Sequence, residues 1–242
     1  MVRILSIILT VILSCYIAFS YVLFHKERNE HLCQGIEIIV RDSLDKHFVN
    51  ESDLISLLKR DGLSPLKKKL SAINTDSIEK HLIKNEMISE AEVYKTPSGK
   101  IKLEVTQKMP ILRVMSANGA YYVDNKGTTM PISQRYVAHV PIATGYMEKE
   151  FAENELYEFA LFLQDNEFWN NQIEQICVFP NKEVELIPRV GRFRIVLGSL
   201  DDFEEKLNKL RLFYDQAIPK VGWDKYSVID LKYKNQIVCT KK

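Results

Sequence analysis

The N-terminal part of the chain contains an uninterrupted run of uncharged, mainly apolar residues. The run covers 21 positions, from Ile4 to Phe24, and a charged segment follows it at once with Lys26, Glu27 and Arg28. A helix of this length rises about 31 Å, which matches the hydrocarbon core of a bilayer. The pattern therefore predicts a single membrane-spanning helix at residues 4–24, between a tail at residues 1–3 and a linker at residues 25–33.

The sequence leaves two other interpretations of this segment open. A cleaved signal peptide would have an apolar core of only about 7 to 15 residues, ending at a small-residue cleavage site. The stretch Ile12–Cys15 also resembles the cleavage site of a bacterial lipoprotein, but the residues from Tyr16 to Phe24 remain apolar. An uncleaved span agrees best with the length of the run. Basic residues flank it on both sides, so local charge does not specify its orientation.

Residues 34–109 show the order strand, helix, helix, strand, strand. Apolar and polar positions alternate over residues 36–40 and again over residues 101–106, which is the period of a half-buried strand. Ala91 and Val93 lead into the turn sequence Thr96–Gly99, so the last two strands are expected to form a hairpin.

Two helices are expected between the first strand and this hairpin. Asn50 is suited to cap the first, with Asp53 at its third position, and one face then carries Leu54, Leu57 and Leu58. The second is expected to begin with a capping box from Asp76 to Glu79 and to bury Ile78 and Leu82. These elements form a small β-α-α-β-β domain.

From Pro110 to the end of the chain, strands dominate. Two amphipathic helices interrupt them, one around residues 156–163 and one at residues 203–214 that Ser199 is expected to cap. The chain closes with strands at 226–233 and 236–240 around a tight Lys234-Asn235 link. The remaining expected strands are 111–115, 120–123, 137–143, 173–179, 183–188 and 192–197. The fold class is therefore α+β: an N-terminal transmembrane helix, the β-α-α-β-β domain at 34–109, and a mainly antiparallel β domain with two or more helices at 110–242.

Charge and motif content exclude several function classes. The chain has 33 basic and 32 acidic side chains, so it gives no reason to expect a nucleic-acid partner. Its five histidines are scattered, without metal-ligand spacing, and neither a nucleophile elbow nor a phosphate-binding loop is present. We assign no catalytic residue, metal, cofactor or small-molecule substrate from the sequence. An active site assembled from dispersed residues remains an open alternative.

Two smaller features also have more than one interpretation. Cys177 and Cys239 could form a disulfide in an oxidising compartment, or each could occupy the interior of a strand. The basic run Lys67–Lys69 suits a solvated surface, and the alternative is contact with anionic lipid.

Several stretches, taken in order, resemble the bacterial FtsQ/DivIB cell-division family. The stretch Gln34–Ile38 is similar to the first strand of a polypeptide-transport-associated (POTRA) domain, and residues 88–95 and 100–110 are similar to its last two strands. Tyr122–Asp124 with Gly127 and Pro131, followed by Pro141 and Gly145, resembles the start of the family's β domain. Ile229–Tyr233 resembles its D-L-R-Y signature, with Lys232 in place of the usual arginine and Asn235-Gln236 in place of a glycine-containing turn.

The resemblance implies a non-enzymatic, bitopic scaffold of the division machinery. Its N-terminus would lie in the cytoplasm and its bulk outside the inner membrane, at the septum, where it would bind the membrane proteins FtsB and FtsL. In the family the partner docks on the C-terminal strands of the β domain, which is strand addition to a free edge. The residues that the resemblance marks for this contact are Lys232, Tyr233, Asn235, Gln236, Ile237 and Val238. Tyr233 is the expected anchor, and cross-strand packing is the alternative role for it.

Two other function classes remain as alternatives. POTRA modules also serve envelope assembly and secretion factors, in which they precede a β-barrel of many regular amphipathic strands. A membrane-anchored hydrolase with dispersed catalytic residues is the second. Accumulation at midcell would favour a division protein, whereas a uniform distribution over the envelope would favour the other two.

Overall fold

The computed structural model describes residues 9–21, 31–41 and 48–242. Residues 9–21 form a helix with exposed side chains. No helix within the described ranges combines the length and apolar character needed to cross a bilayer. The expected span Ile4–Phe24 continues beyond this helix at both ends, into residues 4–8 and 22–24, which lie outside the described residues.

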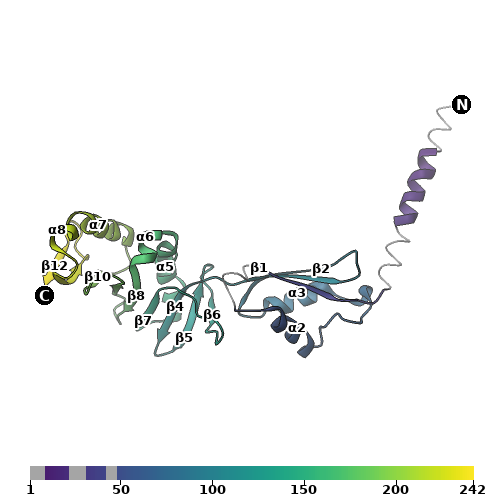
Figure 1. Ribbon diagram of the computed structural model, residues 1–242, viewed down its shortest axis with the longest axis horizontal. Coiled ribbons are helices and arrows are strands. Elements are labelled where there is room, and N and C mark those ends of the chain that lie inside the picture. Colours follow the sequence, from purple (N-terminus) through teal and green to yellow (C-terminus); the bar gives the residue numbers. More distant parts are fainter. Residues whose placement is uncertain (1–8, 22–30, 42–47) are drawn as a thin grey trace. The chain divides into compact units, whose positions relative to one another are not determined.

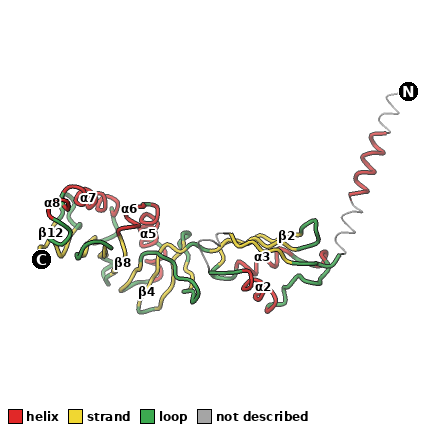
Figure 2. The backbone as a smooth tube through the Cα atoms, viewed as in Figure 1, coloured by secondary structure: helices red, strands yellow, loops and turns green. Residues whose placement is uncertain are grey.

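The chain divides into two compact units, Met1–Gln107 (unit 1) and Lys108–Lys242 (unit 2). Unit 1 contains a three-stranded sheet in the order β1-β3-β2, with β1 parallel and β2 antiparallel to the central β3. Helices α2 and α3 lie on one side of this sheet (Figure 2). The expected β-α-α-β-β order is therefore confirmed. The elements are β1 (Ile36–Arg41), α2 (Glu51–Arg60), the 3-10 turn η1 (Leu70–Ala72), α3 (Thr75–Ile83), β2 (Ile88–Lys95) and β3 (Ile101–Gln107).

The two helices of unit 1 begin at different kinds of cap. Asn50 and Asp53 form the expected capping box of α2, because each side chain accepts a hydrogen bond from the backbone N–H of the other. The cap of α3 is Asn74, which accepts from the backbone N–H of Ser77, so the expected box at Asp76 and Glu79 is wrong. Glu79 instead accepts a 2.7 Å hydrogen bond from the backbone N–H of Val93 and ties α3 to β2.

Fewer leucines of α2 are buried in the core of unit 1 than the helical pattern predicts. Leu54 and Leu58 are fully buried, whereas Leu57 is only half-buried. We predict that Leu54→Ala lowers the unfolding free energy of unit 1 by about 2 to 5 kcal/mol, because the deleted atoms leave a cavity. Leu57→Ala is the matched control and should cost about 1 kcal/mol, since less apolar area is lost. Denaturant titrations followed by circular dichroism measure both, and equal losses would contradict the distinction.

Unit 2 is built on a nine-stranded sheet, and the structure describes all of its residues 108–242. The strand order is β12-β11-β10-β9-β8-β7-β4-β5-β6. Figure 1 shows helices α5 to α8 along one side of these strands. The strands are β4 (Pro110–Ser116), β5 (Gly119–Asp124), β6 (Thr129–Pro131), β7 (Ile142–Gly145), β8 (Ile173–Val178), β9 (Val184–Pro188), β10 (Arg194–Gly198), β11 (Tyr226–Asp230) and β12 (Val238–Lys241). The helices are α4 (Lys149–Glu153), α5 (Glu155–Asp165), α6 (Glu167–Gln172), α7 (Phe203–Gln216) and α8 (Ile218–Val221).

The sheet of unit 2 is mixed, whereas the sequence pattern predicts a mainly antiparallel one. The pairs β4-β7, β7-β8 and β10-β11 are parallel, and the other neighbouring pairs are antiparallel. Parallel neighbours require a crossover connection. Helices α4 to α6 connect β7 to β8, and α7 with α8 connects β10 to β11. The helices that the sequence predicts as interruptions are therefore the crossovers that make these two pairs parallel.

Three boundaries in unit 2 differ from the expected ones. Residues 137–141 form no strand, and β7 begins only at Ile142. Ser199 does not cap α7. The residue before this helix is Asp202, which has a left-handed backbone conformation (φ 52°) and makes no side-chain capping hydrogen bond. The long strand expected at 226–233 ends at Asp230. In the first case the backbone N–H of Ala138 donates to the Tyr122 hydroxyl at 3.3 Å, so this group bonds to a side chain instead of to a neighbouring strand.

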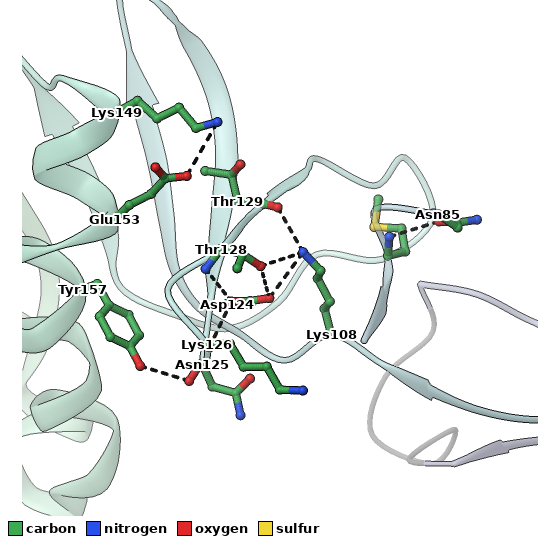
Figure 3. Close-up of polar contacts among 11 residues, drawn as sticks. Asn85, Lys108, Asp124, Asn125, Lys126, Thr128, Thr129, Lys149, Glu153 and Tyr157 are labelled. Carbon is green, nitrogen blue, oxygen red and sulfur yellow. Dashed lines mark hydrogen bonds and ion pairs between the residues drawn. The ribbon is translucent and has the colours of Figure 1, made fainter. Parts of the chain in front are cut away.

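A buried carboxylate fixes the turn between β5 and β6 (Figure 3). Asp124 is 1% exposed and accepts hydrogen bonds from the backbone N–H groups of Lys126 and Thr128 and from the Thr128 hydroxyl, at 3.0, 2.8 and 2.6 Å. The Lys108 ammonium lies 3.4 Å from the same carboxylate and donates to the Thr128 hydroxyl and to the carbonyl of Thr129. The turn predicted at residues 124–127 is therefore present, and the side chain of its first residue, Asp124, stabilises it.

Candidate functional site

The last strand of the chain forms one edge of the unit 2 sheet. β12 pairs antiparallel with β11 on one side and has no neighbouring strand among the described residues on the other. An edge strand presents backbone N–H and C=O groups that an added strand can pair with. Of the six residues marked for partner contact, Val238 is the first residue of β12. Lys232, Tyr233, Asn235, Gln236 and Ile237 lie in the connection between β11 and β12.

This connection is fixed by contacts at both its beginning and its middle. Leu231 is fully buried, and its backbone N–H donates to the carbonyl of Val196 at 2.9 Å. The backbone N–H of Lys232 donates to the Asp230 carboxylate at 2.9 Å. From α7, the Lys209 ammonium donates to the carbonyls of Tyr233 and Lys234 at 2.8 and 2.9 Å. The turn that carries Tyr233 is therefore held in one conformation by its hydrogen bonds to Lys209 of α7.

The six side chains differ in what they present to solvent. Tyr233 is 49% exposed, and Asn235, Gln236 and Val238 are also exposed. Ile237 is half-buried and packs against the core of unit 2. The ammonium of Lys232 lies 3.7 Å from the Glu183 carboxylate. Nearly half of the surface of Tyr233 is therefore accessible to a partner.

A shallow groove lies on the open face of the sheet next to this edge. Its volume is about 270 Å³, and its lining residues are Phe179, Asn181, Glu183, Val184, Glu185, Val196, Asp230 and Lys232. Glu185, Val196, Asp230 and Val238 are direct neighbours across β9, β10, β11 and β12. Glu185, Val196 and Asp230 line the groove, and Val238 continues this row onto the edge strand. The groove is therefore next to any strand that pairs with β12.

Both cysteines of unit 2 are free thiols. Cys177 lies on β8 and Cys239 on β12, with three strands between them, which places them about 19 Å apart at the usual strand spacing. A disulfide requires Cα atoms within about 7 Å, so these two cysteines do not pair. Burial raises the pKa of the Cys239 thiol. Within the described ranges, no group of three or more histidine, cysteine, aspartate or glutamate side chains gathers as a metal site would require.

Two residues that position this surface could not be identified from the sequence pattern. Lys209 reads as a polar residue on the solvent face of α7, and its two hydrogen bonds to the turn depend on the tertiary fold. Gly198 lies beside the aliphatic part of Lys232, where a Cβ atom would come within 2.7 Å of the lysine Cγ. The only local sign was the position of this glycine at the end of a predicted strand.

The chain thus combines a small β-α-α-β-β domain with a larger domain built on a mixed sheet, in which the last strand forms a sheet edge. A POTRA-like domain model matches residues 31–106, and the model described as FtsQ/DivIB, C-terminal related, matches residues 109–240. The chain belongs to the FtsQ/DivIB family. The resemblance read from the sequence is thereby confirmed.

Two known proteins illustrate the relationship. The cell division protein FtsQ of Rhodothermus marinus is 28% identical over 181 residues, which cover 69% of this chain and 64% of that protein. The match thus spans just under two thirds of the relative's length. The solved extracytoplasmic domain of the cell division protein DivIB from Geobacillus stearothermophilus has a TM-score of 0.34 and 13% identity, over 47% of this chain and 97% of that structure.

Proposed function

We propose that this protein is a non-enzymatic scaffold of the bacterial division machinery that recruits or bridges FtsB- and FtsL-type membrane proteins during septum formation. The observation that carries the proposal is the free edge of β12 beside the exposed Tyr233 turn. Membership of the FtsQ/DivIB family supports the division role. The contact residues are Lys232, Tyr233, Asn235, Gln236, Ile237 and Val238.

Docking would combine two kinds of contact. β12 has four residues, so an added strand gains only a few backbone hydrogen bonds along it. Such bonds are independent of sequence, and specificity in strand addition comes from side-chain pockets and anchors. Tyr233 offers an aromatic side chain of the kind that dominates interface energies, on a turn that Lys209 already holds in place. Little ordering of the turn would therefore be needed on binding.

The scaffold would be anchored in the inner membrane through residues 4–24. The uncharged length of this segment supports a single span. The cytoplasmic N-terminus, with the two units outside the cytoplasm, follows from the family resemblance. Localisation at the septum follows from the division role. A fusion of the full chain to a fluorescent protein should accumulate at midcell in dividing cells, and a uniform envelope signal would oppose the proposal.

The docking edge is tested by two changes at the C-terminus. Deleting residues 236–242 should abolish co-purification of the FtsB-type partner from detergent-solubilised membranes, because β12 is lost. Tyr233→Ala should weaken binding by about 1 to 4 kcal/mol if this side chain is an interface anchor. The deletion also removes the half-buried Ile237, so Tyr233→Ala is the sharper variant.

The control for this experiment is Tyr146→Ala. Tyr146 is 57% exposed and lies in the same unit, outside the docking surface. Its replacement should leave partner binding unchanged. Melting temperatures of both variants must be measured, because loss of a packing tyrosine would lower the melting temperature before it changed affinity. Unchanged partner recovery by the truncated chain would refute docking at this edge.

A further inference from the structure

A basic and apolar turn protrudes from unit 1 at the point where the chain enters it. The backbone N–H of Lys68 donates to the carbonyl of Pro65 at 3.2 Å, so Leu66 and Lys67 occupy the two central positions of a β-turn. Lys67 has a positive φ of 62°, which a residue other than glycine adopts at a cost. Leu66 is 38% exposed, and Lys67, Lys68 and Lys69 are exposed.

The entering chain pairs with this turn. The backbone N–H groups of Cys33 and Lys67 donate to the carbonyls of Lys68 and Cys33, at 2.8 and 3.2 Å. Leu32 forms an antiparallel bridge with Lys69 and is 55% exposed. Two exposed leucines and three lysines therefore lie together where residues 31–33 join the domain. We call Leu32 with Leu66–Lys69 the entry patch.

The charge around the entry patch is strongly positive. Residues 59–70 contain five basic side chains and a single acidic one, Asp61. The Asp61 carboxylate lies 2.6 Å from His81 and 3.1 Å from Arg60, and the Lys68 ammonium donates to the carbonyl of Gly62 at 3.1 Å. Apolar side chains beside lysines, on a surface of one sign, are typical of segments that bind the interface of an anionic bilayer.

The length of the chain limits how far the entry patch can lie from the membrane. Seven chain steps separate Phe24, the last residue of the proposed span, from His31, and they reach about 25 Å when extended. A tether this short raises the effective concentration of membrane surface at the patch, so even a weak contact becomes populated. Anchoring by one apolar segment together with basic residues is a common form of membrane attachment.

We propose that the entry patch binds the anionic phospholipid surface of the membrane in which the chain is anchored. Lys67–Lys69 contact the headgroups, and Leu32 and Leu66 insert between them. The inference rests on the proposed anchor at residues 4–24. Its consequence is that unit 1 is held against the bilayer by its entry patch as well as tethered to it.

The test uses the full chain in lipid nanodiscs, made of phosphatidylcholine alone or of equal parts phosphatidylcholine and phosphatidylglycerol. Hydrogen exchange is measured on the backbone N–H groups of Cys33, Lys67, Lys68 and Leu70, which hold the patch together. We expect exchange about tenfold slower in the anionic discs, because lipid contact suppresses opening of these bonds. Salt at about 1 M should abolish the difference, since it shortens the screening length to about 3 Å.

The variant Lys67→Gly, Lys68→Gln, Lys69→Gln removes the three charges and should remove the protection. Its first change also relieves the positive φ, so the turn is expected to keep its conformation. The matched control is Lys80→Gln, Lys84→Gln, Lys95→Gln, which removes three exposed charges elsewhere in unit 1 and should retain the protection.

Each result has a defined meaning. Equal exchange of the wild-type chain in both kinds of disc overturns lipid binding by the entry patch while leaving the anchor intact. Loss of protection in the control variant overturns it as well, because the effect would then follow total charge. Absence of the chain from discs of either composition overturns the anchor and, with it, this inference.

Discussion

Replacing Gly145 by alanine is expected to lower the unfolding free energy of unit 2 by about 3 kcal/mol or more. Gly145 ends β7 and pairs with Val178 of the parallel strand β8. Its φ is 106°, and a Cβ atom there would lie 2.2 Å from the carbonyl oxygen of Val178. That same oxygen accepts a 2.9 Å hydrogen bond from the backbone N–H of Tyr146. The substitution therefore combines backbone strain with displacement of a strand and loss of a hydrogen bond.

Gly119→Ala separates these contributions. Gly119 also has a positive φ, 122°, but nothing lies within 4 Å of the position of an added Cβ. Its replacement should show the cost of strain alone, about 1 kcal/mol. Both tryptophans of the chain, Trp169 and Trp223, belong to unit 2, so tryptophan fluorescence during denaturant titration reports this unit specifically. Equal losses in the two variants would show that β7 and β8 are not packed as closely as the structure has them.

Local chemistry explains which elements the sequence could predict. The alternating residues 101–106 form β3, in which every second residue is buried. One face of this strand is covered by the helices of unit 1 (Figure 2). Asn50 and Asp53 satisfy each other's backbone within four residues, so their capping box needs no tertiary information. The next helix is capped by Asn74 and not by Asp76. Both residue types cap well, so the sequence alone does not decide between two helix starts this close together.

Tertiary contacts decide the rest. Residues 137–141 have strand-like composition, yet they form no strand, and the backbone N–H of Ala138 donates to the side chain of Tyr122. The strand expected at 226–233 stops at Asp230. The next residue, Leu231, is buried, and the Lys209 ammonium binds the carbonyls of Tyr233 and Lys234. Most of the six marked residues therefore lie in the connection between β11 and β12, where the sequence pattern predicts strands. No local pattern could indicate that a lysine on α7 supports it.

Removal of the Asp124 carboxylate is expected to destabilise unit 2 by about 3 kcal/mol. Asp124→Ala would leave the backbone N–H groups of Lys126 and Thr128 without their acceptor. It would also leave the Lys108 ammonium, whose side chain is only 16% exposed, without its counter-charge. Breaking a buried pair from one side is costly, because the remaining charge stays desolvated.

Two further variants distinguish the charge from the hydrogen bonds. Asp124→Asn keeps one acceptor oxygen for the turn and loses the charge, so its cost should be roughly half that of Asp124→Ala. Lys108→Met removes the cation and retains most of the apolar contact of the side chain. If the pair is coupled, the double variant Asp124→Asn, Lys108→Met should be destabilised by less than the sum of the two single changes, as measured by tryptophan fluorescence. Strict additivity would show that Asp124 acts only as the acceptor of its own turn, and that Lys108 contributes through the Thr128 hydroxyl and the Thr129 carbonyl alone.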